Sequence, residues 1–231
     1  MKRFYTDVSI VEAEGDFAIQ LDGRPVRTPA RAVLALPTAA LAEAVAAEWR
    51  AQRETVDPAS MPVTGLANAA IDHVATDKSR FAAGVARYAQ SDLLCYRADG
   101  PDTLVARQAA AWDPLLDWAR ARYDVAFTVT QGILPVAQPD DTLVRLEAAV
   151  VALDPFTLCG LSTLVTLSGS LVCGLALVEG GRDIDAIWQA AEIDEAWQVE
   201  QWGEDAEASA RAARRQTEFS MAGAFCGMSR M

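Results

Sequence analysis

Four carboxylates in the last fifth of the chain have the types and spacing that chemistry could use: Glu192, Asp194, Glu195 and Asp205. Paired carboxylates can exchange protons with a substrate or bind a metal ion. On a helix, Glu192 and Glu195 would supply half of a di-iron site, but no Glu-x-x-His motif accompanies them. No EF-hand spacing occurs. A metal-assisted enzyme that uses residues 192–205 is therefore kept as the alternative function.

Other signs of catalysis are missing from the sequence. His73 is its one histidine, so any histidine-dependent triad or ordinary metal site would have to use that residue. The expected place of His73 near a helix C-terminus explains it structurally, because that end of a helix favours a cation. The sequence contains no GxGxxG, Walker or GxSxG motif. We therefore expect a protein that is not an enzyme and needs no cofactor and no metal.

The composition around these carboxylates favours binding of another protein. Residues 183–207 hold nine acidic side chains, no basic side chain and the tryptophans Trp188, Trp197 and Trp202. Tryptophan offers a large apolar contact area at a low cost in entropy, and carboxylates select partners by charge. The segment is therefore a candidate interaction surface.

A helix must position these residues, and residues 183–202 are expected to form it. In a helix that begins at Ile184, Glu195 falls in an apolar stripe with Ile187, Trp188 and Trp202. Two interpretations follow. Glu195 is either a core carboxylate paired with an arginine of a neighbouring helix, or a residue that faces a partner. Arg211, Arg214 and Arg215 follow the acidic segment and could pair with it.

The remaining pattern predicts an α+β fold. The first 36 residues alternate like antiparallel strands, with Asp22-Gly23 as a hairpin turn. Residues 92–97 resemble a further strand that could return to this sheet, and 125–130 another. Thr38 is expected to cap a helix over 39–53. Further helices are expected at 64–74, 78–90, 101–123, 142–153, 155–178, 183–202 and 205–225. We predict a small β-rich domain over 1–98 and a helical bundle over 99–231.

Charge and composition exclude several classes of partner. The net charge is −12, which argues against nucleic acids and anionic membranes. Residues 156–178 carry no charge and are long enough to span a bilayer, but they are rich in Ser, Thr and Gly. A buried core helix is therefore expected there, with a membrane-anchored subunit as a third possibility. The four cysteines form no CxxC motif and are expected to be free and buried.

Seven phrases spread along the chain together resemble one family. They are residues 21–29 (LDGRPVRTP), 48–52 (EWRAQ), 57–64 (DPASMPVT), 92–97 (DLLCYR), 112–119 (WDPLLDWA), 195–198 (EAWQ) and 202–205 (WGED). In this order and spacing they are similar to the assembly chaperones that attend the α subunit of the F-type ATP synthase soluble head. The resemblance spans about residues 4–225.

The resemblance implies a chaperone that binds the unassembled α subunit and shields its β-facing surface from aggregation. It implies no nucleotide and no metal. The implied client contacts are Glu195, Trp197, Glu200, Trp202, Gly203, Glu204 and Asp205. The absence of a presequence predicts a cytoplasmic bacterial member, whereas eukaryotic relatives would work in the mitochondrial matrix. The acidic charge predicts a monomer when free.

Overall fold

The N-terminal part of the chain forms a small antiparallel sheet. In the computed structural model, which describes residues 1–230, its strands are β1 (Val8–Ala13), β2 (Asp16–Leu21), β3 (Arg24–Pro25) and β4 (Ala35–Leu36). β2 is central: β1 pairs along one side, and β3 and β4 pair along the other. The two strands predicted at 24–28 and 32–36 are shorter than expected, although Arg27 and Val33 still form an isolated bridge between them.

Tight turns connect the first three strands. Leu21 pairs with Arg24, so Asp22 and Gly23 alone form the loop, with φ values of +48° and +75°. These angles are those of a type I′ turn, which suits the twist of a hairpin. The Asp22 carboxylate also accepts hydrogen bonds from the backbone amides of Asp7 (2.8 Å) and Thr6 (3.0 Å), which lower its pKa. The hairpin predicted from Asp-Gly is confirmed.

Helix α1 (Ala39–Ala51) covers this sheet. The Thr38 hydroxyl accepts a hydrogen bond from the Leu41 amide and begins the helix, as predicted. Leu41 and Val45 are fully buried against apolar side chains of the strands, among them Ile19. Helix α2 (Pro62–Ala69) follows a short 3₁₀ helix (Pro58–Ser60) and continues into a π-helical turn (Ala70–Val74) and another 3₁₀ turn (Ala75–Asp77).

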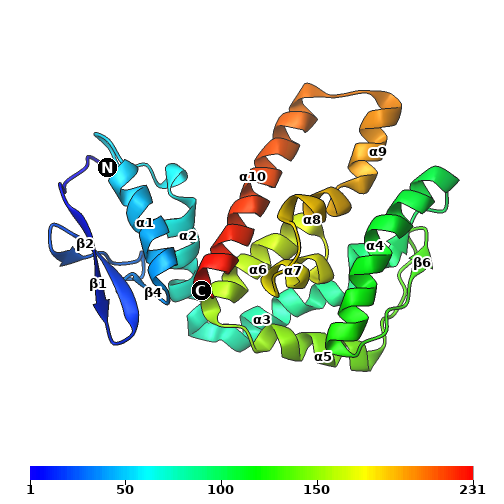
Figure 1. The fold of residues 1–231 in the computed structure, drawn as a ribbon, viewed down its shortest axis with the longest axis horizontal. Helices are drawn as coiled ribbons and strands as arrows, with labels where there is room; N and C mark the ends of the chain where they lie inside the picture. Colours follow the sequence, from blue (N-terminus) through cyan, green and yellow to red (C-terminus); the bar gives the residue numbers. More distant parts are fainter. Residues whose placement is uncertain (231) are drawn as a thin grey trace. The chain divides into compact units, whose positions relative to one another are not determined.

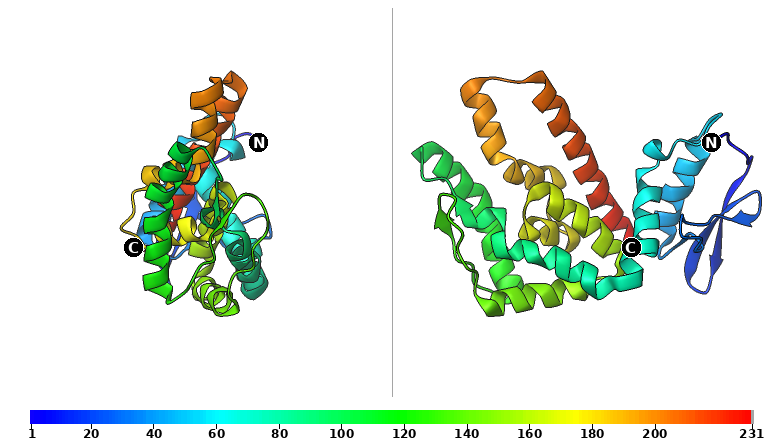
Figure 2. Two further views of the ribbon diagram at one scale, coloured as in Figure 1. Left: turned by 90° about the vertical axis from the view of Figure 1, so that its right-hand side faces the viewer. Right: turned by 180° about the vertical axis from the view of Figure 1, so that it is seen from behind.

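The rest of the chain is mainly helical, which confirms the predicted α+β class. Its helices are α3 (Lys78–Ala86), α4 (Asp102–Tyr123), α5 (Asp140–Val151), α6 (Pro155–Ser168), α7 (Leu171–Val178), α8 (Ile184–Ala191), α9 (Ile193–Trp202) and α10 (Ala206–Ser229). Two 3₁₀ turns (Arg87–Ser91 and Leu93–Cys95) lie between α3 and α4. Figure 1 shows α9 leading away from α8 and α10 returning in the opposite direction, and the view from behind in Figure 2 agrees.

Contacts group the chain into two compact units. Unit 1 comprises Met1–Lys78, Asp154–Gly160 and the residues from Ala224 onward, and unit 2 comprises Ser79–Leu153 and Leu161–Gly223. The acidic segment, the grooves beside it and the residues that they contact, all described below, belong to unit 2. A division into domains at residues 98 and 99 remains a proposal.

Two expected elements are placed differently by the structure. The strand expected at 92–97 does not join the N-terminal sheet: β5 (Tyr96–Arg97) pairs in parallel with β6 (Thr130–Gln131) in unit 2. β6 is what remains of the strand expected at 125–130. Asp92 explains part of this placement, because its buried carboxylate accepts hydrogen bonds from the amides of Leu94 and Val172 and so ties the segment to the start of α7.

The uncharged segment at 156–178 is two helices and not one. Gly169 has φ +69° and ends α6, and the Ser170 hydroxyl accepts a hydrogen bond from the Cys173 amide (3.0 Å) at the start of α7. α7 is buried along nearly its whole length, as expected for a core helix. Among residues 1–230, no helix combines the length and the apolar character needed to cross a membrane. All four cysteines are free and buried, as predicted.

Candidate protein-interaction site

Helix α8 anchors the acidic segment in the core of unit 2. The Asp183 side chain accepts a hydrogen bond from the Ala186 amide (2.8 Å) and caps the helix start. Ile187 and Trp188 are buried, and the indole of Trp188 packs on Phe219 with a centroid distance of 5.1 Å. At the other end, the Trp112 indole N–H donates to the Ala190 carbonyl (2.7 Å). Ala190 is near the C-terminus of α8, where backbone carbonyls have no donor from the same helix.

The helix expected over 183–202 breaks at Glu192, where φ is −101° and ψ is +17°. The Glu192 carboxylate makes two contacts with the Arg215 guanidinium of α10, at 3.0 Å and 3.2 Å. Arg215 also donates to the Leu167 carbonyl (2.8 Å) and lies over the Trp188 ring. Partial burial raises the Glu192 pKa against the opposing effect of Arg215.

This break overturns one interpretation of Glu195. Because α8 and α9 are separate helices, helix faces counted from Ile184 do not apply to residues after Glu192. Glu195 is exposed and does not lie in an apolar stripe. A carboxylate paired with an arginine of a neighbouring helix does exist, but it is Glu192. The core interpretation of Glu195 is therefore wrong. The prediction that an arginine of 211–215 pairs with the acidic segment is confirmed for Arg215.

Helix α9 is held against α4 by polar contacts. Arg107 forms an ion pair with Glu200 (2.7 Å) and lies over the Trp197 ring at 5.0 Å from its centroid. The hydrogen bond from Arg107 lowers the Glu200 pKa. The buried Gln108 amide donates to Asp194 (2.7 Å). No residue of α9 is buried, so the helix presents most of its surface to solvent.

The seven predicted contact residues follow one another along α9 and the turn after it. Trp197 is half-buried, and the other six are exposed: Glu195, Glu200, Trp202, Gly203, Glu204 and Asp205. Gly203 has φ +88° and ends α9, a conformation that favours glycine. Asp205 caps α10 by accepting from the amides of Ala208 and Glu207, both at 2.8 Å, and these bonds lower its pKa. Gly203 and Asp205 thus shape the turn.

The carboxylates that could have formed a catalytic group are engaged separately. Glu192 contacts Arg215, Asp194 contacts Gln108, and Asp205 caps α10. Over residues 1–230, the structure brings together no group of three or more His, Cys, Asp or Glu side chains that could hold a metal ion. His73, the other candidate, is exposed on the π-helical turn of unit 1.

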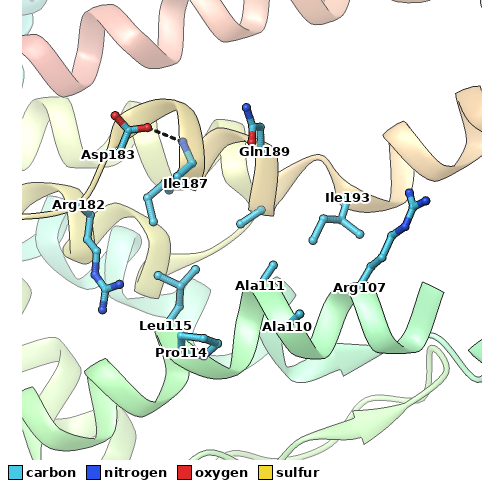
Figure 3. Close-up of a pocket in the computed structure, with 12 residues that line it drawn as sticks. Arg107, Ala110, Ala111, Pro114, Leu115, Arg182, Asp183, Ile187, Gln189 and Ile193 are labelled. Carbon is cyan, nitrogen blue, oxygen red and sulfur yellow. Dashed lines mark hydrogen bonds between the residues drawn. The ribbon is translucent and has the colours of Figure 1, made fainter. Parts of the chain in front are cut away.

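Two grooves flank the contact between α9 and α4. The first, of about 540 Å³, lies between α4 and α8 and is shown in Figure 3. Ala110, Ala111 and Ile187 line it, Arg182 and Asp183 lie near one end, and Arg107 lies near the other. Pro114 also lines it and cannot donate to the Ala110 carbonyl four residues earlier, which leaves that acceptor without its usual helical partner.

The second groove, of about 510 Å³, lies on the side of α9 that carries Asp194, Trp197 and Trp202. Its opposite wall contains residues 96–101 and Ile133. Tyr96 and Arg97 belong to the family phrase 92–97, whereas residues 98–101 and Ile133 were not predicted as contacts from the sequence. The available signal was slight: an apolar pair, Ile133-Leu134, stands between Gly132 and Pro135 in an expected loop. Only the tertiary structure brings this loop to α9.

Comparison with known proteins gives a consistent result. The family model described as ATP12 chaperone protein matches residues 2–120. The mitochondrial protein atp12 of Schizosaccharomyces pombe is 24% identical over 217 residues, which cover 87% of this chain and 74% of that protein. The crystal structure of Atp12 from Paracoccus denitrificans has 45% identity and a TM-score of 0.95, covering 99% of this chain and 98% of that one. A structure from Agrobacterium tumefaciens has 41% identity and a TM-score of 0.92, covering 98% and 85%.

Proposed function

The chain belongs to the ATP12 chaperone protein family, and we propose that it binds the unassembled α subunit of the F-type ATP synthase and shields its β-facing surface until the β subunit replaces it. As a member of a chaperone family the chain is not an enzyme, so the metal-assisted alternative is set aside.

The observation that carries the proposal is the exposed face of α9. Helix α9 has no buried residue, and its apolar side chains Trp202 and Val199 are 78% and 45% exposed. This apolar area is therefore available to a partner. An α subunit without its β partner exposes apolar surface, and such surface leads to aggregation unless another protein covers it. The carboxylates of Glu195 and Glu204 lie beside this area and would pair with basic side chains of the client.

Within this proposal, the seven residues from Glu195 to Asp205 contact the client, with Trp197 and Trp202 as apolar anchors. Gly203 and Asp205 contribute by shaping the turn after α9. We propose further that the free protein is a cytoplasmic monomer in a bacterium. Neither nucleic acid nor membrane enters the proposed cycle.

Co-expression tests the proposal directly. The tagged chain is produced with the cognate α subunit, with β, or with both, and soluble complexes are recovered on the tag. We expect selective recovery of α, which is lost when β is also present. Recovery of β alone, or of neither subunit, would contradict the proposed function.

A charge reversal tests the role of Glu195. Glu195→Lys should leave the unfolding transition unchanged, because the side chain is exposed, but should abolish protection of the α subunit from aggregation. Glu147→Lys is the matched control, since Glu147 is an exposed glutamate on α5, outside the proposed site. Equal protection by Glu195→Lys and wild type would remove Glu195 from the client contact.

A further inference from the structure

Two of the most exposed large apolar side chains of unit 2 line the second groove, and a third follows one of them in the chain. Ile133 is 95% exposed, Trp202 is 78% exposed and Leu134 is 76% exposed. Ile133 and Trp202 line the same groove, together with the half-buried Trp197, and Leu134 follows Ile133 in the loop after β6. Such a cluster costs free energy in water and marks a surface that another molecule covers.

The wall opposite α9 is preformed. Arg97, which is 9% exposed, donates to the Leu94 carbonyl (3.0 Å) and forms an ion pair with Asp113 (2.6 Å). The Gly132 amide donates to the Arg97 carbonyl (2.8 Å), so the start of the Ile133 loop is tied to the same anchor. A groove whose walls are fixed before binding loses little conformational entropy when it is filled.

The charge available in this groove is negative. Its one lining cation, Arg97, is already neutralised by Asp113. Within residues 1–230, neither of its two lining carboxylates takes part in an ion pair: Asp194 accepts a hydrogen bond from the neutral Gln108 amide, and Asp99 is exposed. An apolar groove with unneutralised carboxylates favours an apolar segment that also carries a cation.

We propose that this groove binds an apolar segment of the α subunit that carries a lysine or arginine. The apolar side chains of that segment pack between Trp202 and Ile133, and its cation pairs with Asp99 or Asp194. The inference rests on the proposed function and extends it, because it adds the loop at 132–134 and the Asp99 segment as a second wall of the client site.

The double variant Ile133→Asp, Leu134→Asp tests the groove without touching α9. Both side chains are highly exposed, so the unfolding transition should stay at the wild-type value, whereas the affinity for the purified cognate α subunit should fall by about tenfold or more. Val144→Asp is the matched control, because Val144 is 65% exposed on α5, away from the groove. It should bind as wild type does.

Overlapping synthetic peptides that cover the whole cognate α subunit test the chemistry of the occupant. Peptides retained by the wild-type chain should be apolar and contain a lysine or arginine, and the double variant should lose them. The variant Asp99→Asn should weaken the same peptides and reduce the dependence of their binding on salt concentration. Retention of acidic or uncharged peptides alone would overturn the proposed charge pairing.

The outcomes separate this inference from the function on which it rests. If the wild-type chain recovers no α subunit, the proposed function fails and this inference with it. If the wild type binds α and the double variant binds it equally well, the groove is not part of the client site, although the function stands. If the free chain is dimeric and the double variant is monomeric, a second copy occupies the groove and the inference is wrong.

Discussion

Glu192 and Arg215 are 23 residues apart in the chain but share a two-point ion pair at the bend between α8 and α9. The pair lies beside the buried face of α8, because the Arg215 guanidinium also contacts Trp188 and the Leu167 carbonyl. It thus ties the junction between α8, which is anchored in the core, and α9, which carries the proposed client contacts, to helix α10.

Removal of the arginine from this pair should destabilise the fold. In Arg215→Ala the partly buried Glu192 carboxylate loses both contacts, which should lower the free energy of unfolding by roughly 1–3 kcal/mol, as measured in urea. Arg211→Ala, at an exposed arginine one turn earlier in α10, should change it by no more than about 0.5 kcal/mol. Equal effects of the two substitutions would show that the pair contributes nothing specific.

Asp92 should make stability depend on pH. Complete burial raises its pKa from 3.8 to about 6, although hydrogen bonds from Val172, Ser170, Leu94 and Leu171 oppose the rise. The folded state therefore holds this proton more tightly than the unfolded state. Its stabilising effect is complete below about pH 4 and is lost as the pH rises through about 6, with a total change on the order of 3 kcal/mol.

The comparison of wild type with Asp92→Asn isolates this titration. Asparagine does not titrate, so the wild-type free energy of unfolding minus that of the variant should decrease between about pH 4 and pH 6 and then level off. The variant should be less stable than wild type at low pH, because its amide group cannot accept from both Leu94 and Val172. A difference that does not vary with pH would contradict the raised pKa.

Trp112→Phe should weaken the anchor of α8. Trp112 is fully buried, and its indole N–H is the donor that reaches the Ala190 carbonyl. Phenylalanine leaves this carbonyl unsatisfied and opens a small cavity, so unfolding should become easier by roughly 2–4 kcal/mol in chemical denaturation. Trp118→Phe is the control on the same helix, because Trp118 is only half-buried. A loss as large in the control would point to a general effect of tryptophan removal.

Gly174 should not tolerate even a methyl group. A Cβ at this position would lie 2.7 Å from Leu161 Cδ1 and 2.7 Å from Val165 Cγ2, so α7 packs on α6 without room for a side chain. Gly174→Ala should therefore lower the melting temperature, with a cost of roughly 1–3 kcal/mol. Gly84→Ala, in helix α3 with open space around it, should raise stability by up to about 1 kcal/mol. Stabilisation by both changes would refute the close packing.

Local signals predicted the N-terminal hairpin and the first helix correctly. The Asp22-Gly23 turn and the Thr38 cap depend on residues within a few positions of each other, so the sequence contains the whole cause. The family resemblance was also available from the sequence, because it depends on the order of short phrases along the chain. The α+β class followed from the change of hydrophobic period after about residue 36.

Predictions that required distant contacts were less successful. The helix expected at 183–202 is interrupted at Glu192, which pairs with Arg215 of α10. The interruption of the segment at 155–178 has local causes instead, the positive φ of Gly169 and the Ser170 cap, and these were overlooked. In the segment 92–97, Tyr96 and Arg97 pair with β6, and Asp92 ties the segment to α7 and not to the N-terminal sheet. Periodicity within one segment carries no information about such partners.

The sequence by itself determined that this chain is an acidic member of a chaperone family, with three of its six tryptophans and nine carboxylates, but no basic residue, within residues 183–207. Only the tertiary structure decided that Glu192 is the paired carboxylate, that Glu195 is exposed, and that Ile133 stands across a groove from Trp202. The physical reason is that burial and pairing depend on which distant residues share a site, whereas composition and local turns depend only on neighbours in the chain.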